Sequence, residues 1–350
     1  MPLSKIQRQN IITEIIHQIG SPSSNGFLDI DALAAHYGVS KQSVSRILSE
    51  LQAENRVIAE TAGRKKKYTL PREEIERDFP AAGLSEDKVF REYISAFIAS
   101  APETPRRNFA YAFTEMLNNA AEHSESEKIT VRAAKTECYI EFSIRDYGVG
   151  IFRKIAQAMN LEDDTHAFLE LAKGKFTTKP QNHSGEGIFF SAKAGDIFLI
   201  RCGQIAMTVS GSTRDTGSKY LFKAMDTLEP GTFVNFRIQN DHSETLAEVF
   251  DRYAPDGNGF VKTHIPIRLL EHDHIMPIVS RSQAKRLLAR VEKFQSVTLD
   301  FDGVPEIGQG FADEIFRVFH NNHPEIELIP INCTTAVSNM IRHVCPSESV

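Results

Sequence analysis

One stretch of this 350-residue sequence places three polar side chains at helical spacing among apolar residues. Glu115, Asn119 and His123 are four residues apart, so a helix over about Arg107–His123 would carry all three on one face. A carboxylate can take a proton from water or a hydroxyl, and an amide oxygen can ligate Mg²⁺. This helix is therefore a candidate catalytic element, although its sequence alone fits a solvated polar face equally well.

Glycine-containing motifs that suit a phosphate ligand follow this helix. Two predicted strands, Lys128–Ala133 and Tyr139–Arg145, lead into Asp146-Tyr-Gly-Val-Gly150. We expect a polar, mobile segment to separate that motif from Phe176–Ile188, whose last glycines can open a helix. The free N–H groups of a helix N-terminus can hold phosphate oxygens. Pro230–Arg237 is the last predicted strand of this region.

In this order, the motifs resemble those of the Bergerat-fold (GHKL) ATPases over about Arg107–Asn240. Gyrase, histidine kinases, mismatch-repair proteins and anti-sigma-factor serine kinases share this fold. The resemblance implies that Asp146 accepts a hydrogen bond from the adenine amine and that Asn119 ligates Mg²⁺, while Lys179 neutralises the terminal phosphate of ATP. Glycine lets the backbone approach the base. The expected nucleotide-site residues are Asn119, His123, Asp146, Gly148, Gly150, Lys179, Gly185, Gly187 and Thr232.

Glu115 indicates which ATP chemistry to expect. It lies one helical turn before Asn119, and in the relatives with this spacing the glutamate is the general base. Phosphotransfer to an internal histidine ahead of the ATP site is excluded, because Leu70–Leu117 contains no histidine. Two alternatives remain: slow hydrolysis that switches conformation, or phosphorylation of a Ser or Thr on a separate partner by a kinase of the anti-sigma-factor type.

The charge of the chain is unevenly distributed. Residues 1–70 hold nine Lys/Arg and six Asp/Glu, a net charge of +3. Because the whole chain has a net charge of −6, the remaining 280 residues carry −9. A chain that coats nucleic acid throughout is excluded by the total, but a basic N-terminal module is compatible with it.

The stretch Ile30–Leu70 has helix-turn-helix spacing followed by two short predicted strands, and it resembles a winged helix domain. Its basic hairpin tip and the outward face of the second helix suit contact with DNA phosphates and grooves. A three-helix module for protein contact is the alternative reading. The candidate DNA-binding residues are Lys41, Gln42, Ser43, Ser45, Arg46, Arg64, Lys65, Lys66 and Lys67.

The C-terminal part, His264–Val344, alternates predicted strands and helices, which is typical of a small α/β domain. Val297–Ala312 resembles STAS-like domains, which occur in anti-sigma-factor antagonists. Those antagonists carry a phosphorylatable serine where this sequence reads Gly308-Gln-Gly-Phe311. We therefore expect a docking or dimerisation module. The pair His272 and His274 has metal-like spacing, but surface histidines are the favoured reading since no third ligand is apparent.

The sequence thus predicts a multidomain α+β protein. Four sparse cysteines and short apolar runs favour a cytoplasmic protein without membrane contact. Our leading hypothesis is a transcriptional regulator that binds DNA and Mg-ATP, with the segment Ile151–Ser184 ordered by the nucleotide. The expected domains are a winged helix (1–70), a helical linker (71–106), a Bergerat-fold α/β sandwich (107–260) and a STAS-like domain (261–350).

Overall fold

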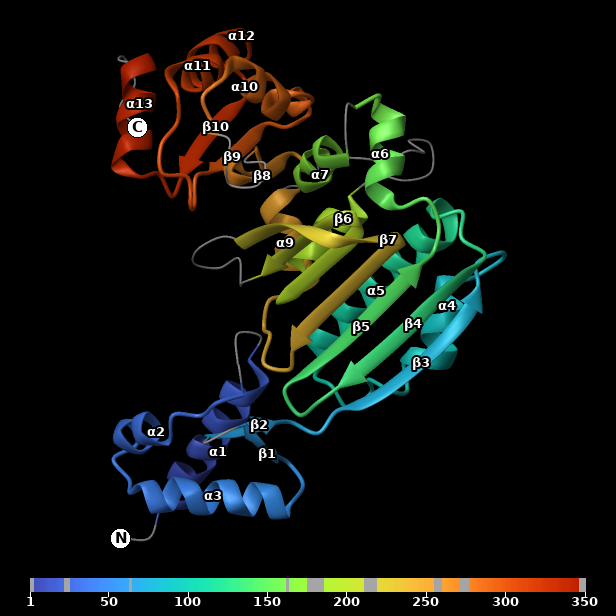
Figure 1. Ribbon diagram of the computed structural model, residues 1–350, viewed down its shortest axis with the longest axis vertical. Coiled ribbons are helices and arrows are strands. Elements are labelled where there is room, and N and C mark those ends of the chain that lie inside the picture. Colours follow the sequence, from blue (N-terminus) through green and yellow to red (C-terminus); the bar gives the residue numbers. More distant parts are fainter. Residues whose placement is uncertain are drawn as a thin grey trace.

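The computed structural model describes residues 3–21, 26–62, 65–161, 164–174, 186–210, 219–254, 260–270 and 277–345. Three bodies follow one another along the long axis of the molecule, with the N-terminal domain at one end and the C-terminal domain at the other (Figure 1). Among the described helices, none combines the length and apolarity needed to cross a membrane.

The N-terminal domain is a helical module with a hairpin, as the sequence predicts. Ser40 accepts a hydrogen bond from the backbone N–H of Ser43 and so begins the third helix, whose apolar stripe, Val44 to Leu51, is buried. The domain has its own apolar core. Its elements are α1 (Lys5–Gly20), α2 (Ile30–His36), α3 (Lys41–Ala53) and the antiparallel strands β1 (Ile58–Ala62) and β2 (Lys65–Thr69).

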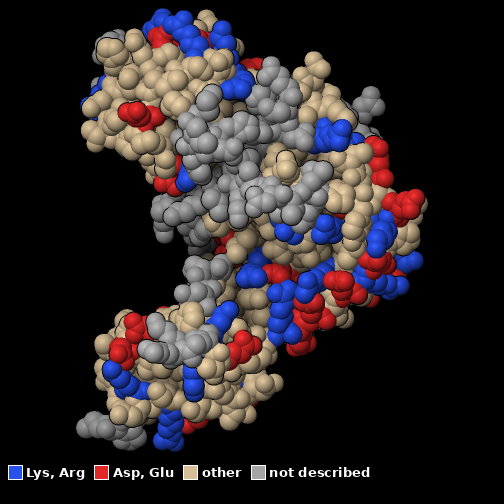
Figure 2. Space-filling model, viewed as in Figure 1, with Lys and Arg blue, Asp and Glu red and all other residues tan. Residues whose placement is uncertain are grey.

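The middle domain is a five-stranded antiparallel sheet with the strand order β3-β4-β5-β7-β6. Helix α5 (Glu103–His123) packs on one face, where Phe109 lies 5.1 Å from Phe142, centroid to centroid. On the opposite face acidic and basic residues interleave, as Figure 2 shows. The strands are β3 (Glu73–Pro80), β4 (Lys128–Lys135), β5 (Tyr139–Asp146), β6 (Ile197–Ser210) and β7 (Lys219–Gln239).

Two segments of the middle domain differ from the sequence expectation. Residues 71–106, expected as a helical linker, supply the edge strand β3, then α4 (Glu86–Val89) and the π-helix η1 (Phe90–Ile94), which pack on the domain. The start of the segment expected to be mobile forms α6 (Ile151–Met159) and α7 (Asp164–Lys173). Phe152 and Ile155 are buried and hold α6 in the core. The polar composition of the segment as a whole had not indicated this helix.

The C-terminal domain has a three-stranded parallel sheet with the order β10-β9-β8, in agreement with the predicted α/β pattern. Its strands are β8 (Lys262–Pro266), β9 (Ser296–Asp300) and β10 (Glu327–Ile331). Its helical elements are η3 (Ile267–Leu270), α10 (Arg281–Leu288), η4 (Val291–Lys293), α11 (Gln309–Ala312), η5 (Asp313–Phe319), α12 (His320–Asn322) and α13 (Thr335–Val344).

The middle and C-terminal domains share one apolar core. Phe189 of α8 (Gly187–Lys193) lies 4.5 Å from Phe260, and Phe260 lies 5.4 Å from Phe294. Helix α9 (Leu246–Tyr253) packs beside α8, with Phe190 and Phe250 4.2 Å apart. Helices α8 and α9 therefore pack together beside the C-terminal domain.

Candidate nucleotide-binding site

Asp146 ends strand β5 and is almost completely buried. Its Oδ1 accepts hydrogen bonds from the backbone N–H groups of Gly148, at 3.0 Å, and Thr232, at 3.1 Å. Burial raises the pKa of Asp146, and the hydrogen bonds from these two residues oppose that rise. A carboxylate held this way at the end of a strand is preorganised to accept a hydrogen bond from a ligand amine.

Thr232 links this carboxylate to the next helix. Besides donating its backbone N–H to Asp146, it accepts a hydrogen bond at Oγ1 from the backbone N–H of Ile151, at 3.0 Å, where α6 begins. The two residues that the motifs assigned to the adenine end of the site thus meet, although 86 positions separate them.

Glycine is required in the turn after Asp146 by close backbone contacts. A Cβ at Gly148 would lie 1.7 Å from the carbonyl oxygen of Ser124, and Gly150 adopts a φ of +82°. Gly231 also touches this turn, since a Cβ there would lie 2.1 Å from the carbonyl oxygen of Asp146. The sequence pattern had placed Gly231 in a motif without indicating a role for it.

Glu115 lies at the other end of the site. A Cβ at Gly187, where α8 begins, would stand 2.0 Å from Oε2 of Glu115. The pKa of Tyr111 is raised by its burial, and further by the negative charges of Glu115 and Glu186. The predicted general base and the predicted phosphate-binding glycine are therefore neighbours, although they come from different motifs.

Helix α5 connects the two ends of the site. Asn119 and His123 follow Glu115 along it and are half-buried, and the helix ends beside Ser124, against which Gly148 packs. At 1.5 Å per residue, Glu115 and His123 are about 12 Å apart along the axis. Asn119 lies between the adenine end and the phosphate end of the site, where an amide oxygen could ligate a cation bridging phosphates.

Lys154 fastens α6 to the end of α5, a role that sequence reasoning missed. Its Nζ donates to the carbonyl oxygen of His123, at 2.6 Å, and forms an ion pair with Glu125, at 2.9 Å. Nothing in the local sequence distinguishes Lys154 from a solvated lysine.

Some predicted residues lie outside the described part of the chain. These are Lys179, Gly185, His272, His274 and Arg64. Within the described ranges, no group of three or more His, Cys, Asp or Glu residues could hold a metal ion.

The predicted DNA-contacting face of α3 is accessible. Lys41, Gln42, Ser45 and Arg46 are exposed and Ser43 is half-buried. Lys41 forms an ion pair with Asp31, at 2.8 Å, and Arg46 with Glu50, at 3.0 Å. Exposed pairs of this kind contribute little stability, so both cations can exchange their partners for phosphates at small cost.

The tip of the β1–β2 hairpin is only partly described. Lys66 is exposed and Lys67 is half-buried on β2. The backbone of Lys65 starts this strand, but its side chain is outside the described set. The structure therefore places three of the four basic wing residues, Lys65, Lys66 and Lys67, on the hairpin that the sequence predicted.

Three protein-family models match the chain, and they follow the order of the three bodies. Residues 22–53 match the C-terminal helix-turn-helix domain of cell division protein CdvB, residues 85–204 the histidine kinase-like ATPase domain, and residues 283–338 a STAS-like domain of unknown function. The chain joins a helix-turn-helix, a histidine kinase-like ATPase and a STAS-like domain. A comparison with curated proteins finds no match.

These matches confirm the architecture expected from the motifs. The histidine kinase-like ATPase domain implies nucleotide binding, with Mg²⁺ as the usual metal, and the helix-turn-helix domain favours DNA as a partner. The ATPase match begins at residue 85, so it includes α4 and η1, which the sequence reasoning had assigned to a linker.

Proposed function

We propose that this protein is a cytoplasmic, DNA-binding transcriptional regulator whose state is switched by Mg-ATP binding and slow hydrolysis. The observation that carries the proposal is the meeting of Glu115 with Gly187 at one end of the site, while Asp146 and Thr232 meet at the other end. Helix α5 then carries the general base and the metal-binding amide, and its C-terminal end lies beside the turn that follows the adenine anchor Asp146.

Mg²⁺, when bound through Asn119, would neutralise phosphate charge. The residues of this chain have the remaining roles. Asp146 would orient the adenine ring, the N-terminus of α8 would contact phosphate oxygens, and Glu115 would take the proton of the attacking water.

The switch part of the proposal rests on what α7 and α8 contact. Lys173, at the end of α7, is buried and donates to the backbone carbonyl oxygens of Arg286, at 3.2 Å, and Ala289, at 2.8 Å, in the C-terminal domain. Thr263 in turn donates its hydroxyl to the carbonyl oxygen of Lys173, at 2.7 Å. A nucleotide that favours one position of these helices would bias the docking of the STAS-like domain.

A second junction joins the middle domain to the N-terminal domain. Arg56 pairs with Glu137 in the turn between β4 and β5, and the thiol of Cys138 donates to the carbonyl oxygen of Ile16, at 3.2 Å. A displacement of the β4–β5 turn would therefore reach the DNA-binding module through direct contacts. Equal ATP affinity of both arrangements would leave nothing to switch.

The deciding experiment follows the γ-phosphate. Purified full-length protein is incubated with ATP labelled on the γ-phosphate, alone and with cell lysate, and free phosphate is compared with label on protein. We expect slow release of free phosphate and DNA binding that differs between ATP and ADP. Label on a Ser or Thr of a partner would instead establish the alternative, a protein kinase, and absence of both nucleotide binding and turnover would overturn the proposal.

A further inference from the structure

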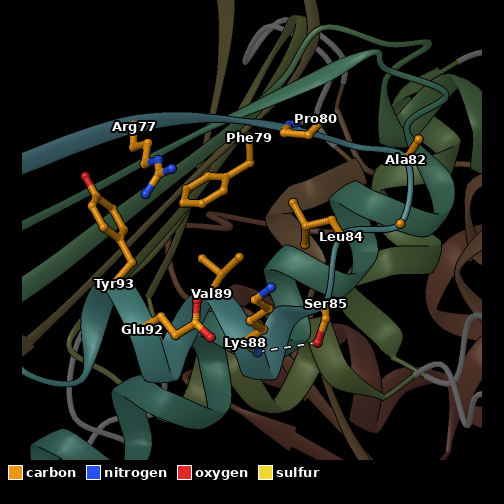
Figure 3. A pocket seen from close by; sticks show the side chains of 11 residues that line it. Arg77, Phe79, Pro80, Ala82, Leu84, Ser85, Lys88, Val89, Glu92 and Tyr93 are labelled. Carbon is orange, nitrogen blue, oxygen red and sulfur yellow. Dashed lines mark hydrogen bonds between the residues drawn. The ribbon is translucent and has the colours of Figure 1, made fainter.

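We propose that the middle domain holds a second ligand site, for a small organic anion with an apolar body, between strand β3 and the helical segment α4–η1 (Figure 3). This site is separate from the nucleotide site and goes beyond the proposed function. It lies at the edge of the sheet, because β3 is the outermost strand.

The cavity has the size of a small-molecule site. Its volume is about 300 Å³, at the lower end of the range of about 300–1,000 Å³ that is usual for ligand pockets. Apolar side chains from both elements form its walls, among them Phe79, Leu84, Val89 and Tyr93. Phe79 and Tyr93 pack edge to face with centroids 5.6 Å apart, so one wall of the cavity is aromatic.

Arg77 breaks the alternation of strand β3. It pairs in register with Val131 and Phe79 pairs with Ile129, both buried, so Arg77 and Phe79 lie on the helix-covered face of the sheet. An apolar residue is expected in that row. Arg77 is exposed, so its presence in this row adds no buried apolar surface, and a local rule broken in this way is a sign of a functional position.

The guanidinium of Arg77 lies over aromatic rings instead of beside a carboxylate. Its central carbon is 5.1 Å from the centroid of Phe79 and 5.9 Å from that of Tyr93. In Figure 3 it points between the two rings. The stacked arginine is thus held in place with its N–H donors still available to an anion.

Lys88 adds a second cation on the helical side. In Figure 3 its ammonium points toward the space between Val89 and Leu84. Among the described residues, neither Lys88 nor Arg77 forms an ion pair, and Glu92 is the only acidic residue of the lining. Two cations against one carboxylate, above an apolar wall, favour a ligand with a negative head and an apolar body.

The occupant would contact elements that pack directly on α5. Phe90, next to Val89, lies 5.8 Å from Phe113, centroid to centroid, and Phe113 precedes Glu115 by two residues. The site is therefore placed where a bound molecule touches the support of the nucleotide site.

The test uses the full-length protein and 1-naphthoate as the probe, an aromatic carboxylate whose neutral analogue 1-naphthamide has nearly the same shape. Binding is measured by calorimetry and by ligand-observed NMR at low salt. Variants Arg77→Gln and Lys88→Gln each remove one cation. Arg91→Gln, an exposed arginine of the same helical segment that does not line the cavity, is the matched control.

We expect 1-naphthoate to bind to the wild-type protein. Its affinity for Arg77→Gln and for Lys88→Gln should be at least about tenfold lower, and its affinity for Arg91→Gln should be unchanged. We also expect 1-naphthamide to bind at least tenfold more weakly than the carboxylate, and Mg-ATP not to displace the probe. Absence of naphthoate binding up to its solubility limit overturns the proposal. Displacement by Mg-ATP, equal binding of the amide, or equal weakening by Arg91→Gln would overturn it as well.

Discussion

Glu115 of α5 and Gly187 of α8 are in such close contact that a methyl group on residue 187 would stand 2.0 Å from the Glu115 carboxylate. Residue 187 must therefore be glycine for Glu115 to keep its position. The packing of α5 against α8 thereby fixes the general base of the proposed reaction at the end of the site where phosphate would bind.

The first prediction concerns this contact. Gly187→Ala should displace the Glu115 carboxylate, and Glu115→Gln should remove its basicity without changing its size. Both should lower ATP turnover by about 10²-fold or more, the usual contribution of a positioned base. Phosphate release measures turnover and a fluorescent nucleotide measures affinity, which Glu115→Gln should leave nearly unchanged. Gly310→Ala in α11 is the control, because an added Cβ there would meet no atom closer than 3.3 Å. Full turnover in Glu115→Gln would show that the general base is wrongly assigned.

A second prediction follows from the buried carboxylate of Asp146. Because burial raises its pKa, Asp146 takes up a proton at higher pH than an ordinary aspartate. Only the ionised form accepts hydrogen bonds from Thr232, Gly148 and a ligand amine together, so ATP affinity should fall as the pH falls through this raised pKa. Asp146→Asn should bind ATP at least about tenfold more weakly at neutral pH, since it loses a charge-assisted hydrogen bond.

Calorimetric titrations of both proteins between pH 4 and 8, with ADP as a second ligand, check this prediction. Protonation of the nucleotide itself affects wild type and variant alike. Their difference should therefore shrink at low pH, and parallel pH profiles would contradict the assignment.

Regular elements were predicted where the sequence pattern is local. The apolar stripe of α3 and the alternation of β4 and β5 are decided by neighbouring residues, so their positions agreed with expectation. Strand β3 was missed because it is an edge strand rich in acidic residues. Its carboxylates pair with β4, as Asp78 does with Lys128, at 2.9 Å, and Glu74 with Arg132. Such pairing is invisible before the strand partner is known.

The same distinction applies to the site. Motif order predicted Glu115, Asp146 and Thr232, and the structure brings Asp146 and Thr232 into contact. Lys173 and Lys193 were not predicted, since each reads as a surface lysine. Their burial results from the docking of two domains, and a single sequence carries no signal for that docking.

A third prediction addresses the DNA-binding module. Replacing the wing residues Arg64, Lys65, Lys66 and Lys67 together by Ala should weaken DNA binding and reduce its salt slope by about 0.9 for each phosphate that the variant no longer neutralises. Fluorescence anisotropy at several salt concentrations measures both quantities. The matched control replaces four exposed basic residues of the other domains, Arg91, Arg107, Lys262 and Lys285. If the control lowers the slope equally, the wing does not contact DNA.

A fourth prediction concerns the buried ion pair of α7. Lys173 Nζ lies 2.6 Å from Glu170, and both side chains are buried beside the C-terminal domain. Lys173→Met leaves the Glu170 carboxylate without its cation, which should lower the free energy of unfolding by about 3–5 kcal/mol. The double variant with Glu170→Gln should recover most of that loss. Denaturant unfolding of the four proteins gives the coupling, and additive losses would contradict a coupled pair.

The last prediction rests on Lys193, at the end of α8. Its side chain is completely buried, and its pKa is lowered from 10.5 to about 7, mainly by burial and also by the positive charge of Arg252, while Asp300 opposes the shift. Between these two pKa values the unfolded chain binds a proton that the folded chain has released. The free energy of unfolding should therefore rise with pH across this window, and the full cost of burying the amine should apply below it.

Lys193→Met removes this titration while keeping the volume of the side chain. The variant should be more stable than wild type at pH 7, and the difference should become smaller toward pH 10 because the wild-type lysine is then neutral in both states. Thermal unfolding midpoints at intervals between these values measure the difference, with Lys262→Met, an exposed lysine, as the control. A Lys193→Met protein less stable than wild type at pH 7 would mean that the ammonium is stabilised by its contacts with the rings of Phe189 and Tyr253, 5.6 and 5.9 Å away. In that case the ammonium of Lys193 would stabilise the packing of α8 against α9.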